Sequence, residues 1–148
     1  YFFQSKQALL HAVMQEGLAR AEASQVAALK ALGARAPAQD RLRTLVRHHF
    51  EVLLGEGSDF IPVMLFEWRS LDATQQQDVR ALKDAYEGVW MPVLRALHRA
   101  GRLKARPEVA RLFIFGALNW SVQWFSDRGA LSLDDLTAQA LVLFTGEA

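Results

Sequence analysis

The chain has 148 residues, which is enough for about one domain with its own hydrophobic core. It has no cysteine, which excludes disulfides, thiolate metal sites and a cysteine nucleophile. Its 17 Lys and Arg against 16 Asp and Glu leave a net charge of +1, without the basic surplus typical of a nucleic-acid surface. No apolar run reaches the roughly 18 residues of a membrane helix. We therefore expect a cytoplasmic protein with no membrane span.

Apolar residues recur at helical spacing through the first half of the chain. The pattern predicts a first helix over residues 5–32, which Gly33 ends. A second apolar stripe runs over residues 42–53 and stops at Gly55. The segment 60–71 is apolar on almost every side, which predicts a deeply buried helix.

The second half is also helical. A capping-box pattern at residues 72–75 opens a helix expected to reach Gly101, with a kink near Gly88 because Pro92 removes a backbone hydrogen bond. A fifth helix is expected over 107–125, and a last one begins at the capping box Ser132-Leu133-Asp134-Asp135. No strand pattern competes. The sequence therefore predicts an all-α bundle of about six helices joined by short loops.

Motifs for catalysis or metal binding are not found in the sequence. The four histidines do not form HExxH or the ExxH spacing of di-iron bundles, and the segment GEGSDF at 55–60 lacks the last glycine of GxGxxG. No P-loop or nucleophile elbow is present. We therefore expect neither an enzyme, nor a metal site, nor a cofactor.

Two stretches carry a resemblance to a known family. The opening YFFQSKQALLHAVMQ resembles the junction after the DNA-binding part of tetracycline-repressor (TetR) family regulators, where an aromatic pair, Ser-Lys and paired leucines follow in order. The stretch FGALNWSVQWFSDRGALSLDDL is similar to the last two helices of a subgroup that includes acyl-CoA-responsive regulators. The residues that match at the junction are Tyr1, Phe3, Ser5, Lys6, Leu9 and Leu10.

The resemblance implies a ligand-controlled transcriptional repressor. Residues 1–4 would be the remnant of a helix-turn-helix head, and residues 5–148 the ligand-binding and dimerisation domain. Tyr1 would belong to the recognition helix and Lys6 would contact a DNA phosphate. A small apolar effector, with acyl-CoA as the leading class, would release the protein from operator DNA. The last two helices would pair with their copies in a homodimer.

Polar and aromatic residues on apolar faces are the candidates for the ligand site. We hypothesise a contact between His49 and Glu67, against the simpler reading of a hydrogen-bonded core histidine and a glutamate paired with an arginine. Asn119 and Gln123 fit ligand contacts, a polar seam between subunits, or hydrogen bonds to a neighbouring backbone. For Trp68, Tyr86 and Trp90 a place in the core is the default, with pocket lining second, whereas Trp120 and Trp124 fit the core, an interface or a pocket wall. The candidates are His49, Phe50, Glu67, Tyr86, Trp90, Gly116, Asn119, Trp120 and Gln123.

The last two helices have wider apolar faces than one core needs, which predicts a dimer interface. The residues expected there are Trp124, Leu133, Leu136, Leu143 and Phe144. A basic run around Gly101 (Arg95, Arg99, Arg102, Lys104 and Arg106) fits a solvated face or a site for CoA phosphates. The alternative function is a helical interaction module without a ligand, its pocket filled by its own aromatics. A cofactor-binding bundle ranks third.

Overall fold

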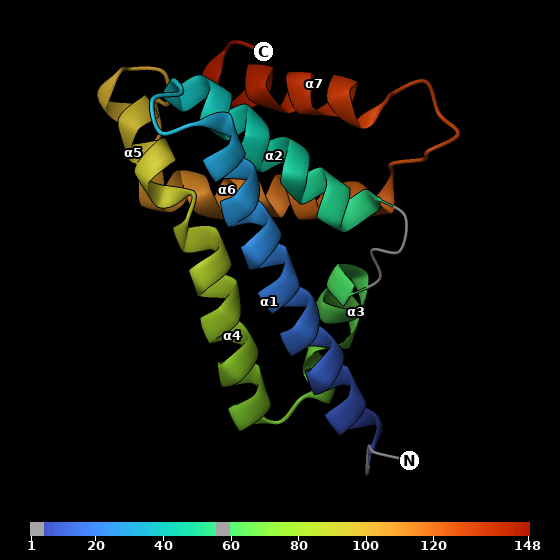
Figure 1. Cartoon of the computed structure of the whole chain (residues 1–148). Coiled ribbons are helices and arrows are strands. Elements are labelled where there is room, and N and C mark those ends of the chain that lie inside the picture. Colours follow the sequence, from blue (N-terminus) through green and yellow to red (C-terminus); the bar gives the residue numbers. More distant parts are fainter. Residues whose placement is uncertain (1–4, 56–59) are drawn as a thin grey trace.

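The computed structural model describes residues 5–55 and 60–148, and these ranges contain seven α-helices, two 3-10 turns and no strand. The predicted all-α fold is confirmed. Figure 1 shows α1 and α4 running side by side, while α2, α6 and α7 are gathered at the end of the molecule away from the start of α1. The elements are α1 (Lys6–Leu32), α2 (Ala38–Leu54), α3 (Phe60–Glu67), η1 (Trp68–Ser70), α4 (Ala73–Gly88), α5 (Met91–Arg99), α6 (Pro107–Trp120), η2 (Ser121–Gln123) and α7 (Leu133–Thr145).

Side-chain caps define the starts of three helices. The Oγ of Ser5 accepts an N–H from the first turn of α1. Reciprocal capping boxes open α4 at Asp72 and Gln75, and α7 at Ser132 and Asp135. Each box satisfies two N–H groups that the helix itself leaves without partners. The expected starts of these helices are confirmed.

The helix expected over residues 72–101 is in fact two helices. α4 ends at Gly88, a turn follows at Val89 and Trp90, and α5 begins at Met91 with Pro92 in its first turn. Proline lacks an N–H, and its ring crowds the carbonyl four residues earlier, so a change of direction here costs little. The expectation of one kinked helix is wrong.

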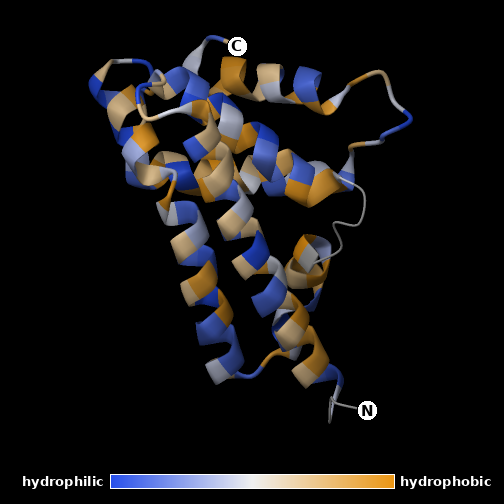
Figure 2. Ribbon diagram, in the orientation of Figure 1, coloured by the Kyte–Doolittle hydropathy of each residue, from blue (hydrophilic) through white to orange (hydrophobic). Residues whose placement is uncertain are grey.

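The core has two parts. The larger cluster joins α2, α5, α6 and α7 around the fully buried Trp90, and the smaller one joins α1, α3 and α4 around Met14 and Val79. Figure 2 shows α3 mostly in hydrophobic colours and α4 mostly in hydrophilic ones. The expected deep burial of α3 is wrong in part, because Phe66 is 63% exposed. No helix of the described ranges is both long and apolar enough to cross a bilayer.

Candidate functional site

A polar network joins three helices inside the apolar interior. His49 of α2 is buried, with its Nδ1 2.9 Å from Tyr86 Oη on α4 and its Nε2 2.7 Å from Asn119 Oδ1 on α6. The His49 ring also contacts the Phe115 ring edge to face, at 5.3 Å between centroids. The structure thus brings together three of the ligand-binding candidates.

Burial decides the protonation of this network. It lowers the pKa of His49 to about 4, although the hydrogen bond to Asn119 works in the opposite direction, and it raises the pKa of Tyr86. A neutral imidazole has one donor and one acceptor, so with Oδ1 of Asn119 facing it, Nε2–H donates to Asn119 and Nδ1 accepts the Tyr86 O–H. No hydrogen bond among the described residues uses the Asn119 Nδ2 group. It is therefore available to donate to the carbonyl of a ligand.

The network borders a small cavity of about 20 Å³ between α1, α2, α3, α4 and α6. Its walls are mainly apolar, with one cation and one carboxylate among them. This volume is far below the roughly 300 Å³ of an open ligand site. The site is therefore closed in this structure. The lining residues besides the network are Leu18, Ala21, Ile61, Met64, Lys83, Glu87 and Phe115.

Glu87 is the buried charge of the cavity, and the sequence analysis missed it. Its carboxylate lies 3.8 Å from Lys83 Nζ and 3.2 Å from Arg111 Nε. Burial raises the pKa of Glu87, and the two cations oppose that rise. The sequence feature that could have pointed to Glu87 is Lys83, which lies four residues earlier and therefore on the same face of the helix.

A second buried network stands behind the cavity. Gln25 of α1 is fully buried, donating from Nε2 to the Tyr86 carbonyl at 2.9 Å and accepting from Trp90 Nε1 at 2.7 Å. Trp90 and Phe50 therefore belong to the core and do not line the cavity. For these two residues the simpler reading is the right one.

The proposed His49–Glu67 contact is wrong, because both His49 ring nitrogens already have other partners. Glu67 ends α3, where its carboxylate accepts from Ser70 Oγ at 3.1 Å and lies 3.9 Å from Lys6 Nζ. Its partner is thus a lysine of α1.

Three further candidates lie on the surface. Gly116 and Trp120 are on the outer face of α6, and Trp120 is 65% exposed. α6 ends at Trp120, so Gln123 falls in the exposed turn η2 and does not share a face with Asn119. Their assignment to the ligand cavity is wrong in this structure.

The residues expected at a dimer interface divide into two groups. Leu143 is 81% exposed and Trp124 is 55% exposed, as an interface would require. Leu133 and Phe144 are half-buried against the protein's own core. Leu136 is buried within that core, and placing it at an interface is wrong.

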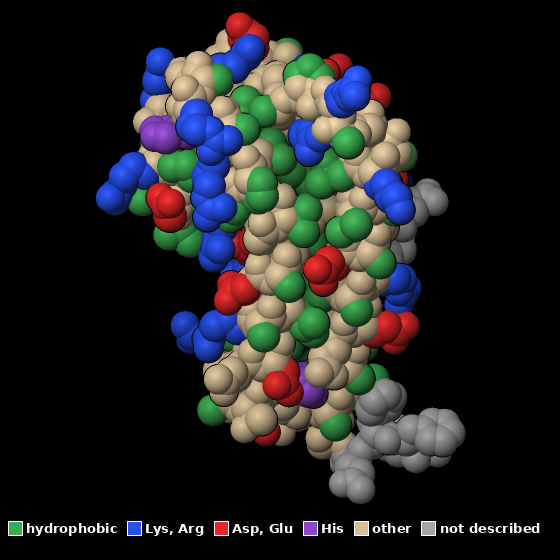
Figure 3. Space-filling view, turned by 60° about the vertical axis from the view of Figure 1, so that its left-hand side comes forward, with side chains coloured by type: hydrophobic (Ala, Val, Ile, Leu, Met, Phe, Trp, Pro, Cys, Tyr) green, Lys and Arg blue, Asp and Glu red, His purple; other side chains and the backbone are tan. Residues whose placement is uncertain are grey.

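None of the residues in the basic run lines the cavity. In Figure 3 Lys and Arg side chains gather at the upper left, over α5 and the loop after it. Arg102 is paired with Glu147 at the end of the chain. Arg102 and Lys104 also line a shallow surface groove of about 520 Å³ beside α6 and α7, so both readings of the basic run stay predictions.

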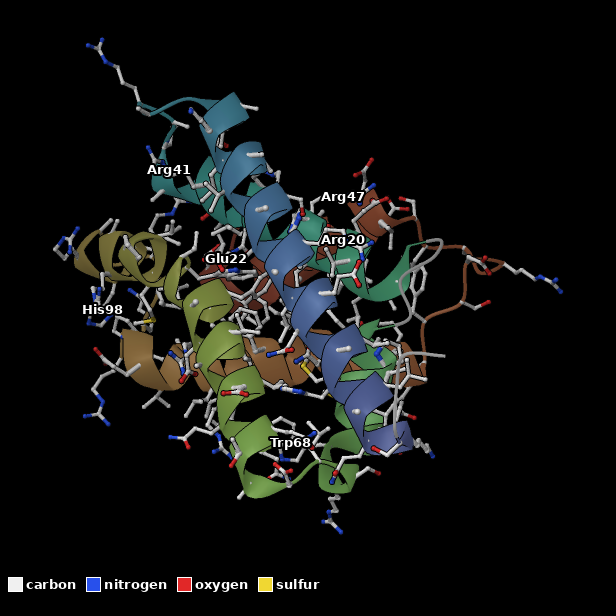
Figure 4. All side chains as sticks on the ribbon, turned by 60° about the horizontal axis from the view of Figure 1, so that its bottom comes forward. Arg20, Glu22, Arg41, Arg47, Trp68 and His98 are labelled. Atoms are coloured by element: carbon white, nitrogen blue, oxygen red, sulfur yellow. The ribbon has the colours of Figure 1, made fainter. Side chains whose placement is uncertain are left out.

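A shallow groove of about 620 Å³ lies between α1, α2 and α7, and is wider than the cavity. Figure 4 shows Arg47 between α2 and α7. Its guanidinium pairs with Asp134 at 2.7 Å and with Glu51, and Arg43 pairs with Asp40. Because the chain itself neutralises these cations, we take the closed cavity as the candidate site.

A family model described as "Tetracyclin repressor-like, C-terminal domain" matches residues 35–146. The chain belongs to this family. Proteins with this TetR-like domain are transcriptional regulators and not enzymes, in agreement with the lack of catalytic motifs in the sequence. No curated protein sequence matches the chain.

Solved structures agree with the family. PfiT, described as a superantigen, is 34% identical, with 96% of this chain and 74% of PfiT covered and a TM-score of 0.80. AibR, solved with isovaleryl coenzyme A and operator DNA, is 22% identical (99% and 78% covered, TM-score 0.81). A TetR-family regulator from Bordetella parapertussis 12822 is 23% identical (97% and 73% covered, TM-score 0.83). At these identities the last two show a shared fold.

Proposed function

We propose that residues 5–148 are the ligand-binding and dimerisation domain of a TetR-type transcriptional repressor, released from operator DNA by a small apolar effector of the acyl-CoA class. The observation that carries the proposal is the closed cavity, which has mainly apolar walls and an amide donor that no described residue uses. One wall of the cavity is α1, the helix with which the domain begins. AibR, with the same fold, was solved with an acyl-CoA and operator DNA, which supports this effector class.

The DNA-binding part of the proposal concerns the start of the chain. Residues 1–4 are proposed as the end of a helix-turn-helix head, and Tyr1 among them lies outside the described residues. Lys6 is the first residue of α1 and is exposed, with its Nζ 3.9 Å from Glu67. An exposed lysine at this position can bind a phosphate of the DNA backbone, and Lys6 would then leave the Glu67 carboxylate.

α1 is the element that would carry the signal. Leu18 and Ala21 of α1 line the cavity, and the same helix begins at Lys6. At 1.5 Å of rise per residue the stretch from Lys6 to Leu18 is about 18 Å long, so a tilt of about 6° moves its start by about 2 Å. Two heads in a dimer must match one helical turn of DNA, and a ligand that favours the tilted state shifts the population off the operator.

The proposed homodimer would use the outer faces of α6 and α7. Large apolar side chains are exposed there and include two that the sequence analysis missed, Leu112 and Phe113. An apolar patch of this kind is rare on a monomer. Two copies related by a two-fold axis would cover it with a four-helix arrangement.

The experiment that tests the function uses the full-length gene product. Fluorescence anisotropy measures its affinity for DNA from its own promoter region, with and without a panel of acyl-CoA thioesters that includes isovaleryl-CoA. We expect tight operator binding and a loss of affinity of tenfold or more with at least one thioester. Absence of a helix-turn-helix upstream of Tyr1, or operator binding that no thioester changes, would contradict the proposal.

A second candidate function is the ligand-free interaction module. The observation that favours it is the cavity volume of about 20 Å³, since a site filled by its own side chains needs no effector. The two candidates separate in the same assay, because the module predicts no response to any small molecule.

A further inference from the structure

A surface groove of about 250 Å³ lies next to the closed cavity. It is lined by Met64, Leu65, Trp68, Arg80 and Lys83, from α3, η1 and α4. Both α3 and α4 pack on α1, while few contacts join them to each other, which leaves this space open. Figure 4 shows Trp68 between the ribbons of α3 and α4.

Two side chains line both spaces, Met64 and Lys83. Met64 is buried between them, and methionine is unbranched with three rotatable bonds, so it can swing aside at low cost. The volumes of the groove and the cavity together come close to the roughly 300 Å³ at which ligand sites begin. The flexible Met64 and the half-exposed Lys83 thus lie between the two spaces.

The charges at the mouth of the groove are all positive. Arg80 and Lys83 line it, and no carboxylate of residues 5–55 and 60–148 does. The Arg80 guanidinium lies over the Trp68 ring, 5.5 Å from its centroid, and forms no ion pair with a carboxylate of the described ranges. The Lys83 side chain is half exposed and leans 3.8 Å toward Glu87, which Arg111 can continue to balance if Lys83 turns outward.

The inner end has a different chemistry. Beyond Met64 the walls include the apolar Leu18, Ala21, Ile61 and Phe115 beside the buried Glu87 carboxylate, and the Asn119 amide is a donor that no described residue uses. This end suits an alkyl chain or an acyl carbonyl, and a charge there would be desolvated.

We infer that the groove and the cavity are two ends of one channel for a small amphipathic anion, whose tail passes Met64 to reach Asn119 while its anionic headgroup stays on Arg80 and Lys83. The inference rests on the proposed function only for the role of this molecule as effector. A free carboxylate and the phosphates of a CoA ester share the required headgroup chemistry.

The test is calorimetric titration of the chain with four probes: octanoate, octanoyl-CoA, 1-octanol, which has the tail without the charge, and CoA, which has the head without the tail. We expect one or both of the amphipathic anions to bind at least tenfold more tightly than octanol and CoA. Which of the two binds more tightly distinguishes a carboxylate from a CoA head. Equal binding of octanol and the anions, or no binding of either anion at 1 mM, would overturn the channel.

Variants separate head from tail. Arg80 lies on the surface, and Arg80→Glu should weaken the binding of the anions about tenfold while changing the affinity for octanol by less than twofold. The matched control is Arg95→Glu, because Arg95 is an exposed arginine of α5 that lines neither space. Met64→Trp should block the tail and lower the affinity of octanol and of both anions alike. Equal effects of the two arginine variants would sink the headgroup assignment.

Methyl NMR locates the bound probe. The ε-methyl of Met64 should shift on saturation with the anion, while that of Met91 in the larger core should not. An effector that releases operator DNA without shifting Met64 would refute the channel and leave the proposed function standing. Binding that shifts Met64 without changing operator affinity would sustain the channel and contradict the proposed function.

Discussion

His49 should make the stability of the protein depend on acid in a way that can be calculated. Its pKa falls from the ordinary 6.5 to about 4 because burial disfavours the charged ring. Between these two values the unfolded chain binds more protons than the folded one, so stability is full above pH 6.5 and is lost as the pH falls toward 4. A shift of this size corresponds to about 3 kcal/mol at pH 4.

The assay is guanidinium unfolding from pH 7.5 to pH 4, comparing the protein with His49→Gln, which retains a donor and an acceptor but does not titrate. We expect the free energy of unfolding of the parent to fall by about 3 kcal/mol more than that of the variant. Glu87 contributes with the opposite sign because its pKa is raised, and the comparison removes its effect since both proteins contain it.

NMR titration of the His49 ring gives the same quantity directly. Parallel stability curves for the two proteins, or a His49 ring that titrates near 6.5, would refute the account of a neutral, buried relay between Tyr86 and Asn119.

Three further outcomes are expected. Gln25→Ala leaves the Trp90 N–H and the Tyr86 carbonyl buried without partners, so chemical unfolding should show a loss of about 2–4 kcal/mol, and an unchanged midpoint would contradict the second network. Asp72→Ala removes the cap of α4 and should cost about 1 kcal/mol in the same assay, whereas no loss would mean that the box is not formed in solution. Leu143→Glu should leave thermal stability of the protomer intact and abolish the dimer in analytical ultracentrifugation; a variant that remains dimeric would move the interface elsewhere.

Helix ends were predictable wherever a local signal exists. The caps at Ser5, Asp72 and Ser132 lie where the sequence places them, because an N-cap acts within its own turn. The break before Pro92 was misjudged as a kink. Proline permits both outcomes, and the packing of α5 against α2 and α6, which the local sequence does not encode, favours the break.

Only part of the candidate site could be predicted from the sequence. His49, Tyr86 and Asn119 stand out as polar groups on apolar faces. Glu67 occupies the same position in the apolar pattern of its helix as His49 does in the pattern of α2, so both side chains were expected to face the core. However, α3 ends at Glu67 and continues as the tighter 3-10 turn η1, and the Glu67 carboxylate lies near α1 instead.

The two faces of α6 could not be told apart from the sequence. Both are apolar, one packed on the core and the other exposed, so Trp120 and Gly116 were assigned to the wrong side. Leu136 was misplaced for the same reason on α7, where helical spacing does not say which apolar stripe faces the core.

The central claim is that the cavity around His49, Tyr86 and Asn119 receives the effector, and NMR of the liganded protein tests it most directly. On saturation with the tightest-binding thioester or acid, the account predicts that the largest shifts fall on the His49 ring and the Asn119 side-chain amide, with a downfield shift of the Nδ2 protons as they donate to the ligand carbonyl. Shifts confined to the exposed face of α6 and α7, or to the basic run around Gly101, with His49 and Asn119 unmoved, would contradict it.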